Sequence, residues 1–202
     1  MDWMEGEHLS EFVAHNTNEA LANKLGQALW DFYMFQMHRL KKVHADPHPG
    51  NFLISGKGEL IAIDFGCMKE VPMSFYTPYF ELAQKENISN PEVFRSKMYE
   101  LEILRPDDTQ EEVDFFTDMF HEMLSLFTQP FHSETFDFSD ATFFGKIAEL
   151  GEKYSKSTEL RKMNGNRGSK HFIYINRTFF GLYNLMFDLK AKAVKINNFV
   201  TL

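Results

Sequence analysis

The stretch HADPHPGNFLISGKGELIAIDFG, residues 44–66, decides the fold expected for this 202-residue chain. Its two apolar runs, 52–54 and 60–63, are joined by Ser55-Gly56-Lys57-Gly58 and bounded by polar blocks. This pattern predicts a β-hairpin with polar loops at its ends. The hairpin would bring three side chains able to handle a phosphate and a metal to one edge: Asp46, Asn51 and Asp64.

Phosphoryl transfer requires the chemical groups that these three side chains carry. Mg²⁺ prefers hard oxygen ligands, commonly carboxylates together with phosphate oxygens and water. Protein kinases place their catalytic groups as H-R-D-x-x-x-x-N followed by D-F-G. Asp46 and Asn51 keep the D-x-x-x-x-N spacing, and Asp64-Phe65-Gly66 follows after the hairpin. The compound pattern predicts a kinase-like catalytic core. The alternative, in which Asp46 and Asn51 merely cap turns, does not explain both blocks together.

The catalytic block departs from the protein-kinase pattern at two positions. Ala45 stands where H-R-D has Arg, and His48 follows two residues after Asp46. With these departures, residues 44–51 and 64–66 resemble the UbiB/AarF (ABC1-type) family of atypical kinases, which is associated with ubiquinone biosynthesis. Aminoglycoside and choline phosphotransferases use an H-x-D-x-H-P-x-N type of loop too, but they usually lack the Phe-Gly that follows the second Asp here.

The resemblance implies roles for the polar residues of this block. Asp46 would be the catalytic residue that accepts the substrate proton or positions the nucleophile. Asn51 and Asp64 would hold Mg²⁺ on the phosphates of ATP. His48 lies near the position where protein kinases place a phosphate-contacting Lys, so it is assigned to the nucleotide site, although a packing role fits the sequence equally well.

Three further residues, His44, Phe65 and Gly66, complete the motif as structural members. His44 is expected to brace the loop by hydrogen bonding rather than by chemistry. A zinc site on His44 and His48 is a weak alternative, because Pro47 between them prevents the helix that would align the two rings, and no third ligand is evident.

The first residues of the chain resemble the segment in which the N-terminal lobe of this family ends. Residues 1–6 would then be the hinge, and the backbone of Asp2, Trp3 and Met4 would bind adenine. The same resemblance implies that the N-terminal kinase lobe, a partner in covering the nucleotide, is missing from this chain. The alternative is that Met1 is a true start and that these residues form an edge strand.

A short helix over 7–15 and a long helix from Asn16 are expected before the catalytic block. Asn16-x-x-Glu19 has the spacing of a capping box. Trp30 is expected in the core rather than against a ligand. Apolar residues at helical spacing predict the buried face of the long helix: Leu21, Leu25, Ala28, Leu29, Phe32 and Phe35.

Residues 72–202 are expected to form a helical subdomain, so that 1–202 would make up the C-terminal lobe of a protein-kinase-like fold, mainly α with a small β-hairpin carried within 43–66. Thr109 and Ser139 are expected to cap two of its helices. A last helix at about 171–196 carries two apolar stripes, so it should be buried or docked on another surface. Two more helices are expected at about 74–86 and 91–104.

Composition narrows the class of protein and its partners. The net charge of −8 argues against nucleic-acid binding, and the single Cys67 fits a reducing compartment. No signal peptide is visible, and no apolar run is long enough for a transmembrane helix. We therefore expect a cytoplasmic protein. A basic loop within 155–170 leaves peripheral contact with an inner membrane open.

The function expected from the sequence is Mg²⁺-dependent phosphoryl transfer or ATP hydrolysis that supports the biosynthesis of ubiquinone or another isoprenoid quinone, with ATP and Mg²⁺ as cofactors. The short segment between Gly66 and Pro72 leaves little room for a peptide platform, which favours a small-molecule or lipid substrate. Residues 1–202 alone are expected to turn over ATP weakly. Two alternatives stay open: an aminoglycoside- or choline-type phosphotransferase, and a non-catalytic nucleotide-binding or scaffold lobe.

Overall fold

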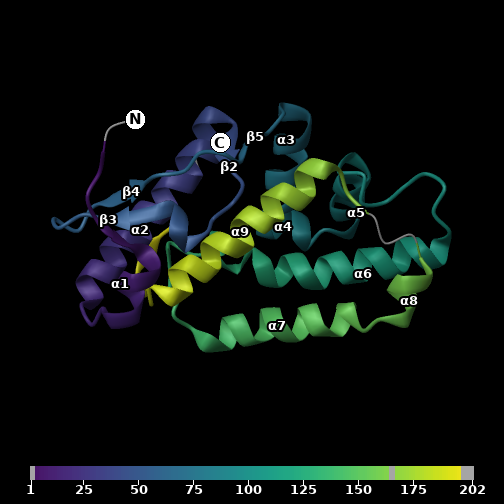
Figure 1. Ribbon diagram of the computed structural model, residues 1–202. Coiled ribbons are helices and arrows are strands. Elements are labelled where there is room, and N and C mark those ends of the chain that lie inside the picture. The colour runs from purple at the N-terminus through teal and green to yellow at the C-terminus, as the bar shows by residue number, and fades with distance from the viewer. Residues whose placement is uncertain (1–2, 164–166, 197–202) are drawn as a thin grey trace. The chain divides into compact units, whose positions relative to one another are not determined.

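The computed structural model of the chain describes residues 3–163 and 167–196 and divides into two compact units (Figure 1). The first unit contains the described parts of Met1–Val71, Glu134–Asp140 and Tyr174–Leu202. The second contains the described parts of Pro72–Ser133 and Ala141–Ile173. Among the described residues, no helix is both long enough and apolar enough to cross a membrane.

The first unit combines short antiparallel strands with a few helices. Its strands are β1 (Glu7–His8), β2 (Lys42–His44), β3 (Phe52–Ile54), β4 (Leu60–Ala62), β5 (Met68–Glu70), β6 (Thr135–Phe136) and β7 (Val194–Lys195). β1 pairs with β3 and β3 with β4; β2 pairs with β5, and β6 with β7. Its helical elements are α1 (Leu9–His15), α2 (Glu19–Phe35), the π-helix η1 (Gln36–Leu40), the 3₁₀ turn η2 (Pro49–Asn51) and α9 (Lys170–Asp188) from Tyr174 onward.

The predicted hairpin is confirmed. β3 and β4 are antiparallel, with Phe52 opposite Ala62 and Ile54 opposite Leu60. The loop between them turns at Gly58, whose φ of +68° lies in the left-handed region that favours glycine. On the other edge of β3, a Cβ added to Gly6 would lie 2.8 Å from the carbonyl oxygen of Ile54, so this glycine permits the close approach of the entering chain.

Helix α2 is the long helix that the sequence predicted, but both of its ends differ from the prediction. Its N-cap is Asn18, whose side chain accepts a hydrogen bond from the Leu21 N–H at 3.0 Å. The predicted cap, Asn16, instead accepts from the Asn18 N–H. At the other end Phe35 is exposed, contrary to the prediction. The turn that follows is a π-helix, which holds an extra residue per turn, and it is Gln36 and Met37 of that turn that are buried.

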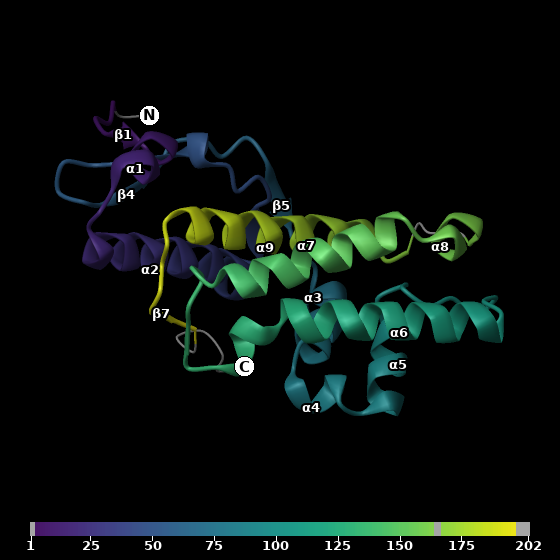
Figure 2. The ribbon, with the colours of Figure 1, turned by 90° about the horizontal axis from the view of Figure 1, so that it is seen from below.

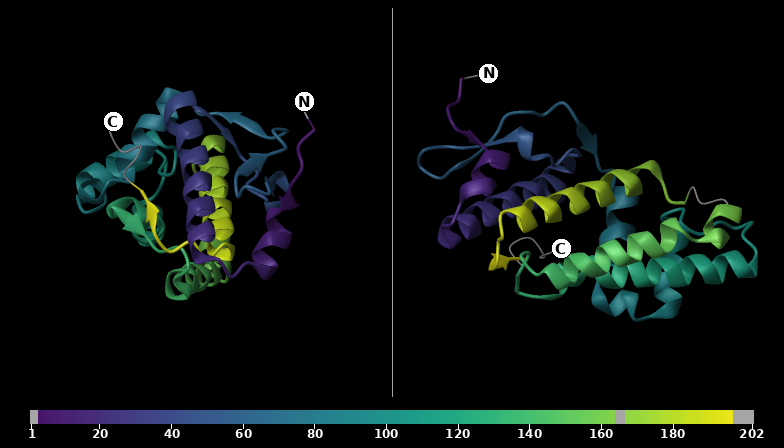
Figure 3. Two further views of the ribbon diagram at one scale, coloured as in Figure 1. Left: turned by 90° about the vertical axis from the view of Figure 1, so that its left-hand side faces the viewer. Right: turned by 60° about the horizontal axis from the view of Figure 1, so that its bottom comes forward.

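The core of the first unit lies along α2 and the part of α9 from Tyr174 onward, which run side by side (Figures 2 and 3). Trp30 is fully buried, as predicted, with its ring 5.9 Å from that of Phe138. Phe138 in turn lies 5.3 Å from the ring of Tyr183. A predicted apolar stripe of the last helix is buried throughout: Ile175, Phe179, Leu182, Met186 and Leu189.

The second unit is helical, and its helices α6 and α7 lie side by side (Figure 2). Thr109 begins α6 with the predicted capping box, since its hydroxyl accepts from the Glu112 N–H while Glu112 accepts from the Thr109 N–H. Its described elements are α3 (Met73–Leu82), α4 (Lys85–Ile88), α5 (Pro91–Glu100), α6 (Gln110–Phe127), η3 (Gln129–His132), α7 (Ala141–Ser155) and α8 (Thr158–Lys162).

Several predicted helix boundaries are wrong. The helix expected over 74–86 is two helices, because the chain leaves the helix at Ala83 and Gln84 and restarts at Lys85. With Ser139 as its cap the helix would begin at residue 140, but it begins at Ala141, and the Ser139 hydroxyl donates to Asp137.

The last helix also ends early. It stops at Asp188 rather than at 196, because Lys190 takes a positive φ of 56° and the chain then enters β7. A positive φ at a residue other than glycine marks a place where the helix cannot continue. The periodicity of the sequence therefore located the helix but not its end.

Candidate functional site

Two strand pairs bring the ends of the catalytic block together. β2 and β5 are antiparallel, with His44 opposite Met68. Beyond that pair, the Ala45 N–H donates to the Cys67 carbonyl oxygen at 2.8 Å. The residue before Asp46 is therefore bonded to the residue after Gly66, while the hairpin closes the loop from the other side. Cys67 takes part through its backbone.

Asn51 is held in one orientation by both its side chain and its backbone. Its Nδ2 donates to the Asp46 carbonyl oxygen at 2.8 Å, and its own carbonyl oxygen accepts from the Ile63 N–H at 3.0 Å. These bonds tie the catalytic loop to the residue that precedes Asp64. Within 3–163 and 167–196, no hydrogen bond reaches Asn51 Oδ1, which leaves this oxygen available to a cation.

Asp64 is exposed, and Gly66 fixes one of its oxygens. The Gly66 N–H donates to Asp64 Oδ1 at 2.7 Å, which leaves Oδ2 without a hydrogen bond in the described part of the chain. A free amide oxygen and a free carboxylate oxygen fit Mg²⁺, which completes its coordination with phosphate oxygens and water. No group of three or more His, Cys, Asp or Glu side chains among the described residues is arranged to hold a metal by itself.

His44 is buried beneath the loop. Its backbone N–H donates to Gln36 Oε1 at 2.8 Å, and its ring lies 6.2 Å from that of Phe65. Burial lowers the pKa of His44 below its usual value, against the opposing effect of the Asp46 and Asp64 charges.

His48 is exposed and stabilises the turn that follows it. Its Nδ1 accepts from the Gly50 N–H at 3.1 Å, so it caps the 3₁₀ turn η2. Pro49 is the first residue of that turn, where a missing N–H costs nothing. This geometry gives His48 a structural role and leaves its Nε2 as the ring atom able to meet a phosphate.

The residues predicted to bind adenine are only partly placed. Asp2 lies outside the described residues, whereas Trp3 is 90% exposed and Met4 48% exposed. No hydrogen bond in the described part of the chain joins Trp3 or Met4 to the catalytic loop. A hollow of about 320 Å³ lies beside the next residues of the segment, Glu5 to Glu7, and Phe12, Leu21 and Ile54 contribute to its wall.

Sequence reasoning missed one charged residue of the site. Arg177 of α9 points a guanidinium nitrogen at Asp46, with Nη2 3.4 Å from Oδ1. Arg177 is the sole Lys or Arg between Lys170 and Lys190 in the sequence. A lone cation in a largely apolar helix was the available signal. It could not be connected with a loop 131 residues earlier without the fold.

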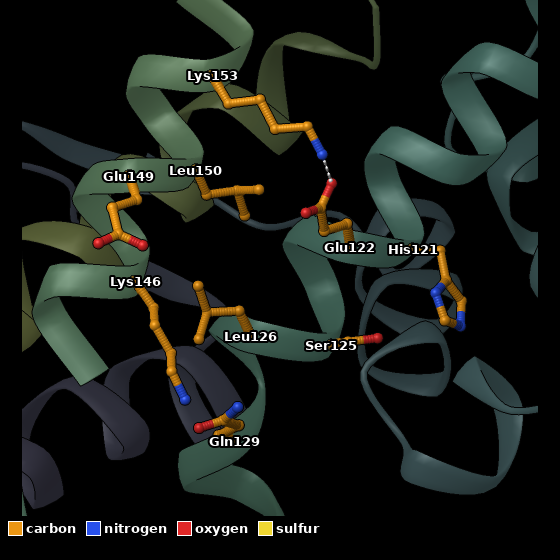
Figure 4. A pocket seen from close by; sticks show the side chains of 9 residues that line it. All are labelled: His121, Glu122, Ser125, Leu126, Gln129, Lys146, Glu149, Leu150 and Lys153. Atoms are coloured by element: carbon orange, nitrogen blue, oxygen red, sulfur yellow. Dashed lines mark hydrogen bonds and ion pairs between the residues drawn. The ribbon is translucent and has the colours of Figure 1, made fainter. Parts of the chain in front are cut away.

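A second hollow, of about 550 Å³, lies in the helical unit between α6 and α7 (Figure 4). Lys153 and Tyr154 of α7 bind Glu122 of α6 at 2.5 Å and 2.6 Å. The Lys153 hydrogen bond, followed by that of Tyr154, lowers the pKa of Glu122. Leu126 and Leu150 supply apolar wall. This hollow contains none of the residues of the catalytic block.

Residues 1–91 match a family described as the ABC1 atypical kinase-like domain. The chain is 36% identical over 72 residues to "Protein ACTIVITY OF BC1 COMPLEX KINASE 3, chloroplastic" of Arabidopsis thaliana, a match that covers 36% of this chain and 10% of that protein. It is 31% identical over 87 residues to "AarF domain-containing protein kinase 1" of Gallus gallus, covering 41% and 17%. The matched part is thus a small fraction of the length of these relatives.

The fold has a solved counterpart. A structure described as the complex of Rv3197 with erythromycin, from Mycobacterium tuberculosis, has a TM-score of 0.68 and 20% sequence identity, and the likeness covers 98% of this chain and 47% of that one. At this identity the likeness concerns the fold alone. The expected fold class is confirmed: the chain is mainly α with a small β-hairpin, as in the C-terminal lobe of a protein-kinase-like fold.

Proposed function

Residues 1–91 belong to the ABC1 atypical kinase-like family, in agreement with the UbiB/AarF resemblance, and from this premise we propose that the protein transfers or hydrolyses the γ-phosphate of ATP with Mg²⁺. One observation carries the proposal. Asn51 is hydrogen-bonded to the Asp46 carbonyl and, through Ile63, to the strand that leads to Asp64. The three polar residues of the motif are thereby linked by the backbone rather than left on independent loops.

In this proposal Asp46 receives the proton of the attacking hydroxyl or water. Its carboxylate is about half exposed, so a substrate can approach it. A general base must lie within hydrogen-bond reach of the proton that it takes. The Asp46 carbonyl is occupied by Asn51 and His48, which fixes the backbone while the carboxylate stays turned to solvent.

Asn51 Oδ1 and Asp64 Oδ2 would hold Mg²⁺ in this reaction. A bound Mg²⁺ neutralises charge on the β- and γ-phosphate oxygens and so lowers the barrier to transfer. The protein's part is to keep both oxygens fixed before the nucleotide arrives. The Asn51 amide does so through Asp46, and the Asp64 carboxylate does so through the Gly66 N–H.

The substrate class is a further part of the proposal. Only β5 and a short connection separate Gly66 from α3, which leaves no long segment to receive a peptide. We therefore favour a small-molecule or lipid acceptor in isoprenoid-quinone biosynthesis, or ATP hydrolysis alone. Asp2, Trp3 and Met4 are proposed to bind the base. Of the predicted helical subdomain 72–202, the part in the second unit is proposed to support the lobe, since residues 134–140 and the described residues from 174 onward belong to the first unit.

The test is Mg²⁺-dependent ATP turnover by the full natural protein and by its Asp64→Asn variant. We expect Asp64→Asn to lose at least about 100-fold in rate, because a metal contributes several kcal/mol at the transition state. Asp107→Asn is the matched control, since it makes the same change at an exposed aspartate of the helical unit. Unchanged ATP turnover in Asp64→Asn would contradict the assignment of Asp64 as a Mg²⁺ ligand.

The same assay separates the competing functions. Turnover that rises only with hydroxylated antibiotics or choline would favour a small-molecule phosphotransferase; erythromycin belongs in that panel because the structural neighbour carries it. ATP binding without turnover under any acceptor would favour a scaffold. Turnover that responds to quinone precursors or lipids would favour the proposed role.

A further inference from the structure

Helix α9 brings a cation to the catalytic carboxylate. Arg177 Nη2 lies 3.4 Å from Asp46 Oδ1, with the two side chains 68% and 47% exposed. Asp46 belongs to the sequence motif, whereas Arg177 lies 131 residues further along the chain and outside it. Both lie in the first unit.

The approach of α9 to the loop is built into the packing and does not depend on the ion pair. Gly181 lies one turn beyond Arg177, and a Cβ added there would come within 2.3 Å of Pro47 Cγ and 3.1 Å of the Pro47 carbonyl oxygen. Tyr174 lies one turn before Arg177, and the Lys69 ammonium group sits 4.7 Å above its ring. One face of α9 therefore approaches the catalytic loop at Arg177 and Gly181, and it contacts β5, the strand that follows Gly66, at Tyr174.

The ion pair itself is weak in this geometry. Charge-assisted N–H···O bonds are usually about 2.7–2.9 Å long and often bidentate, whereas Arg177 makes a single contact at 3.4 Å. Exposed ion pairs contribute little to stability. Most N–H donors of the Arg177 guanidinium are thus uncommitted within the described residues. Such a group can exchange a carboxylate for a phosphate, which it binds in the same planar, bidentate manner.

Phosphoryl transfer supplies the reason to have a cation here. Charge spreads over the equatorial oxygens of the phosphoryl group in the transition state, and enzymes of this class place an Arg, a Lys or a metal against it. In this loop the Arg of H-R-D is replaced by Ala45, and His48 stands near the position of the phosphate-contacting Lys. Asp46 and Asp64 are both carboxylates and would repel an anionic phosphate, so a positive group beside Asp46 would offset that repulsion.

We propose that Arg177 is a phosphate-binding residue of the catalytic site, which makes a weak contact with Asp46 in this structure and binds the phosphoryl group during its transfer. This inference rests on the proposed function, because it assumes that a nucleotide phosphate reaches Asp46. It adds a residue from outside the motif and names its ligand, an anionic phosphoryl oxygen. The fixed approach of α9 at Gly181 is what keeps Arg177 within reach.

The experiment compares Arg177→Gln and Arg177→Lys with the wild type in the full natural protein. We expect Arg177→Gln to lower kcat by on the order of 10²-fold or more, as removal of an electrostatic stabiliser does, with a much smaller change in KM for Mg-ATP. Arg177→Lys should keep part of the rate, since it retains the charge but not the planar fork. Arg95→Gln, which breaks an exposed 3.9 Å contact with Asp114 in the helical unit, is the matched control and should leave kcat unchanged.

A binding measurement distinguishes phosphate binding from mere support of the loop. ADP alone and ADP with aluminium fluoride, which imitates the transferring phosphoryl group, are titrated against each variant. We expect Arg177→Gln to weaken the aluminium fluoride complex in proportion to kcat and to leave ADP affinity within about threefold, because only interactions made in the transition state raise kcat. Equal loss of both affinities would make Arg177 a supporting residue and overturn the inference.

Asp64→Asn keeps this inference separate from the proposed function. If Asp64→Asn turns over ATP like the wild type, the proposed function fails. If Asp64→Asn is inactive while Arg177→Gln keeps wild-type kcat and aluminium fluoride affinity, the proposed function stands and the inference about Arg177 is overturned. If thermal unfolding shows that Arg177→Gln folds poorly, the test is made with Arg177→Lys instead. A wild-type kcat together with weakened ADP binding in Arg177→Lys would contradict the inference, because Arg177 would then affect nucleotide binding and not the transfer step.

Discussion

The catalytic block, residues 44–66, and the helical unit use their polar side chains in opposite ways. In the block, Asn51 and Asp64 each use one polar atom to fix the loop and leave an oxygen without a hydrogen bond among the described residues. In the helical unit, Arg167 is buried and binds both oxygens of Asp108 at 2.6 Å, with its guanidinium 4.0 Å above the Phe116 ring.

This difference separates a region suited to binding a ligand from a region that stabilises the fold. Buried polar groups stabilise a fold only when their hydrogen bonds are satisfied. A site that must bind a metal or phosphate keeps polar atoms open and relies on neighbours to hold them in place. Substitutions in the block should therefore change activity with little effect on stability, and substitutions in the helical unit should do the reverse.

The largest effect is expected for Asp46→Asn. A general base contributes roughly 10²–10⁴-fold to rate, so kcat should fall by that factor. The free energy of unfolding should stay within about 0.5 kcal/mol, because the side chain is half exposed and the loop is held by its backbone. Steady-state ATP turnover and urea unfolding measure the two quantities. A stability loss as large as the rate loss would contradict the separation drawn between the two regions.

The converse is expected for Arg167→Met in the helical unit. Removal of one partner of a buried ion pair leaves an uncompensated charge on Asp108 and costs about 3–5 kcal/mol. Urea unfolding should show this loss, while turnover per folded molecule stays at the wild-type value. Adding Asp108→Leu to Arg167→Met should recover much of the stability, because the unpaired charge is then removed. A double variant no more stable than the single one would show that packing, not charge, determines the loss.

The same pair makes the stability of this unit depend on pH. Burial alone would raise the pKa of Asp108, but the hydrogen bonds from Arg167 and the Arg105 N–H and the charges of both residues outweigh it, and the net pKa is lowered. A carboxyl with a lowered pKa in the folded state stabilises above its unfolded value of about 4, and this contribution is lost as the pH falls further. Arg167→Met should lose stability less steeply below about pH 4 than the wild type does, as acid titrations of unfolding would record.

An intermediate effect is expected where the site depends on packing. Gly181→Ala places a Cβ against Pro47 and should cost about 1–3 kcal/mol by overpacking. It should also lower kcat, because relief of the clash moves α9 and Arg177 relative to the loop. The control is Gly151→Ala in α7, where an added Cβ meets nothing within 4 Å; alanine there should stabilise by up to about 1 kcal/mol through helix propensity. Loss of stability in both variants would contradict the packing argument.

The sequence predicted features that depend on a short segment better than features that depend on contacts between distant segments. Asp46, Asn51 and Asp64 could be proposed as site residues from the sequence because the chemistry of such a motif is tied to fixed spacings along a short segment. The capping box at Thr109 was likewise local. Arg177 was not predictable, because its partner Asp46 lies 131 residues away in the sequence. The two residues meet where Gly181 packs closely against Pro47, and no sequence pattern predicts that contact.

Helix ends were predicted less well for a similar reason. Periodicity identifies a buried face but not the residue at which the chain leaves it, as the positive φ of Lys190 illustrates. Strands of two or three residues, such as β6 and β7, carry too short a pattern to detect. Their pairing is decided by residues about 60 positions apart, Thr135 with Lys195, and so only by the fold.

The smallest effect is expected at helix caps, where both regions should respond alike. Thr109→Ala removes the N-terminal bonds of α6 and should cost about 1 kcal/mol, as the loss of a cap commonly does. Asn18→Ala at the start of α2 should cost somewhat less, because Asn18 accepts a single N–H, from Leu21, without a reciprocal partner. Urea unfolding compares the two, and neither variant should alter kcat. A fall in kcat for Asn18→Ala alone would show that α2 transmits changes at its first turn to the catalytic block, whereas α6 does not.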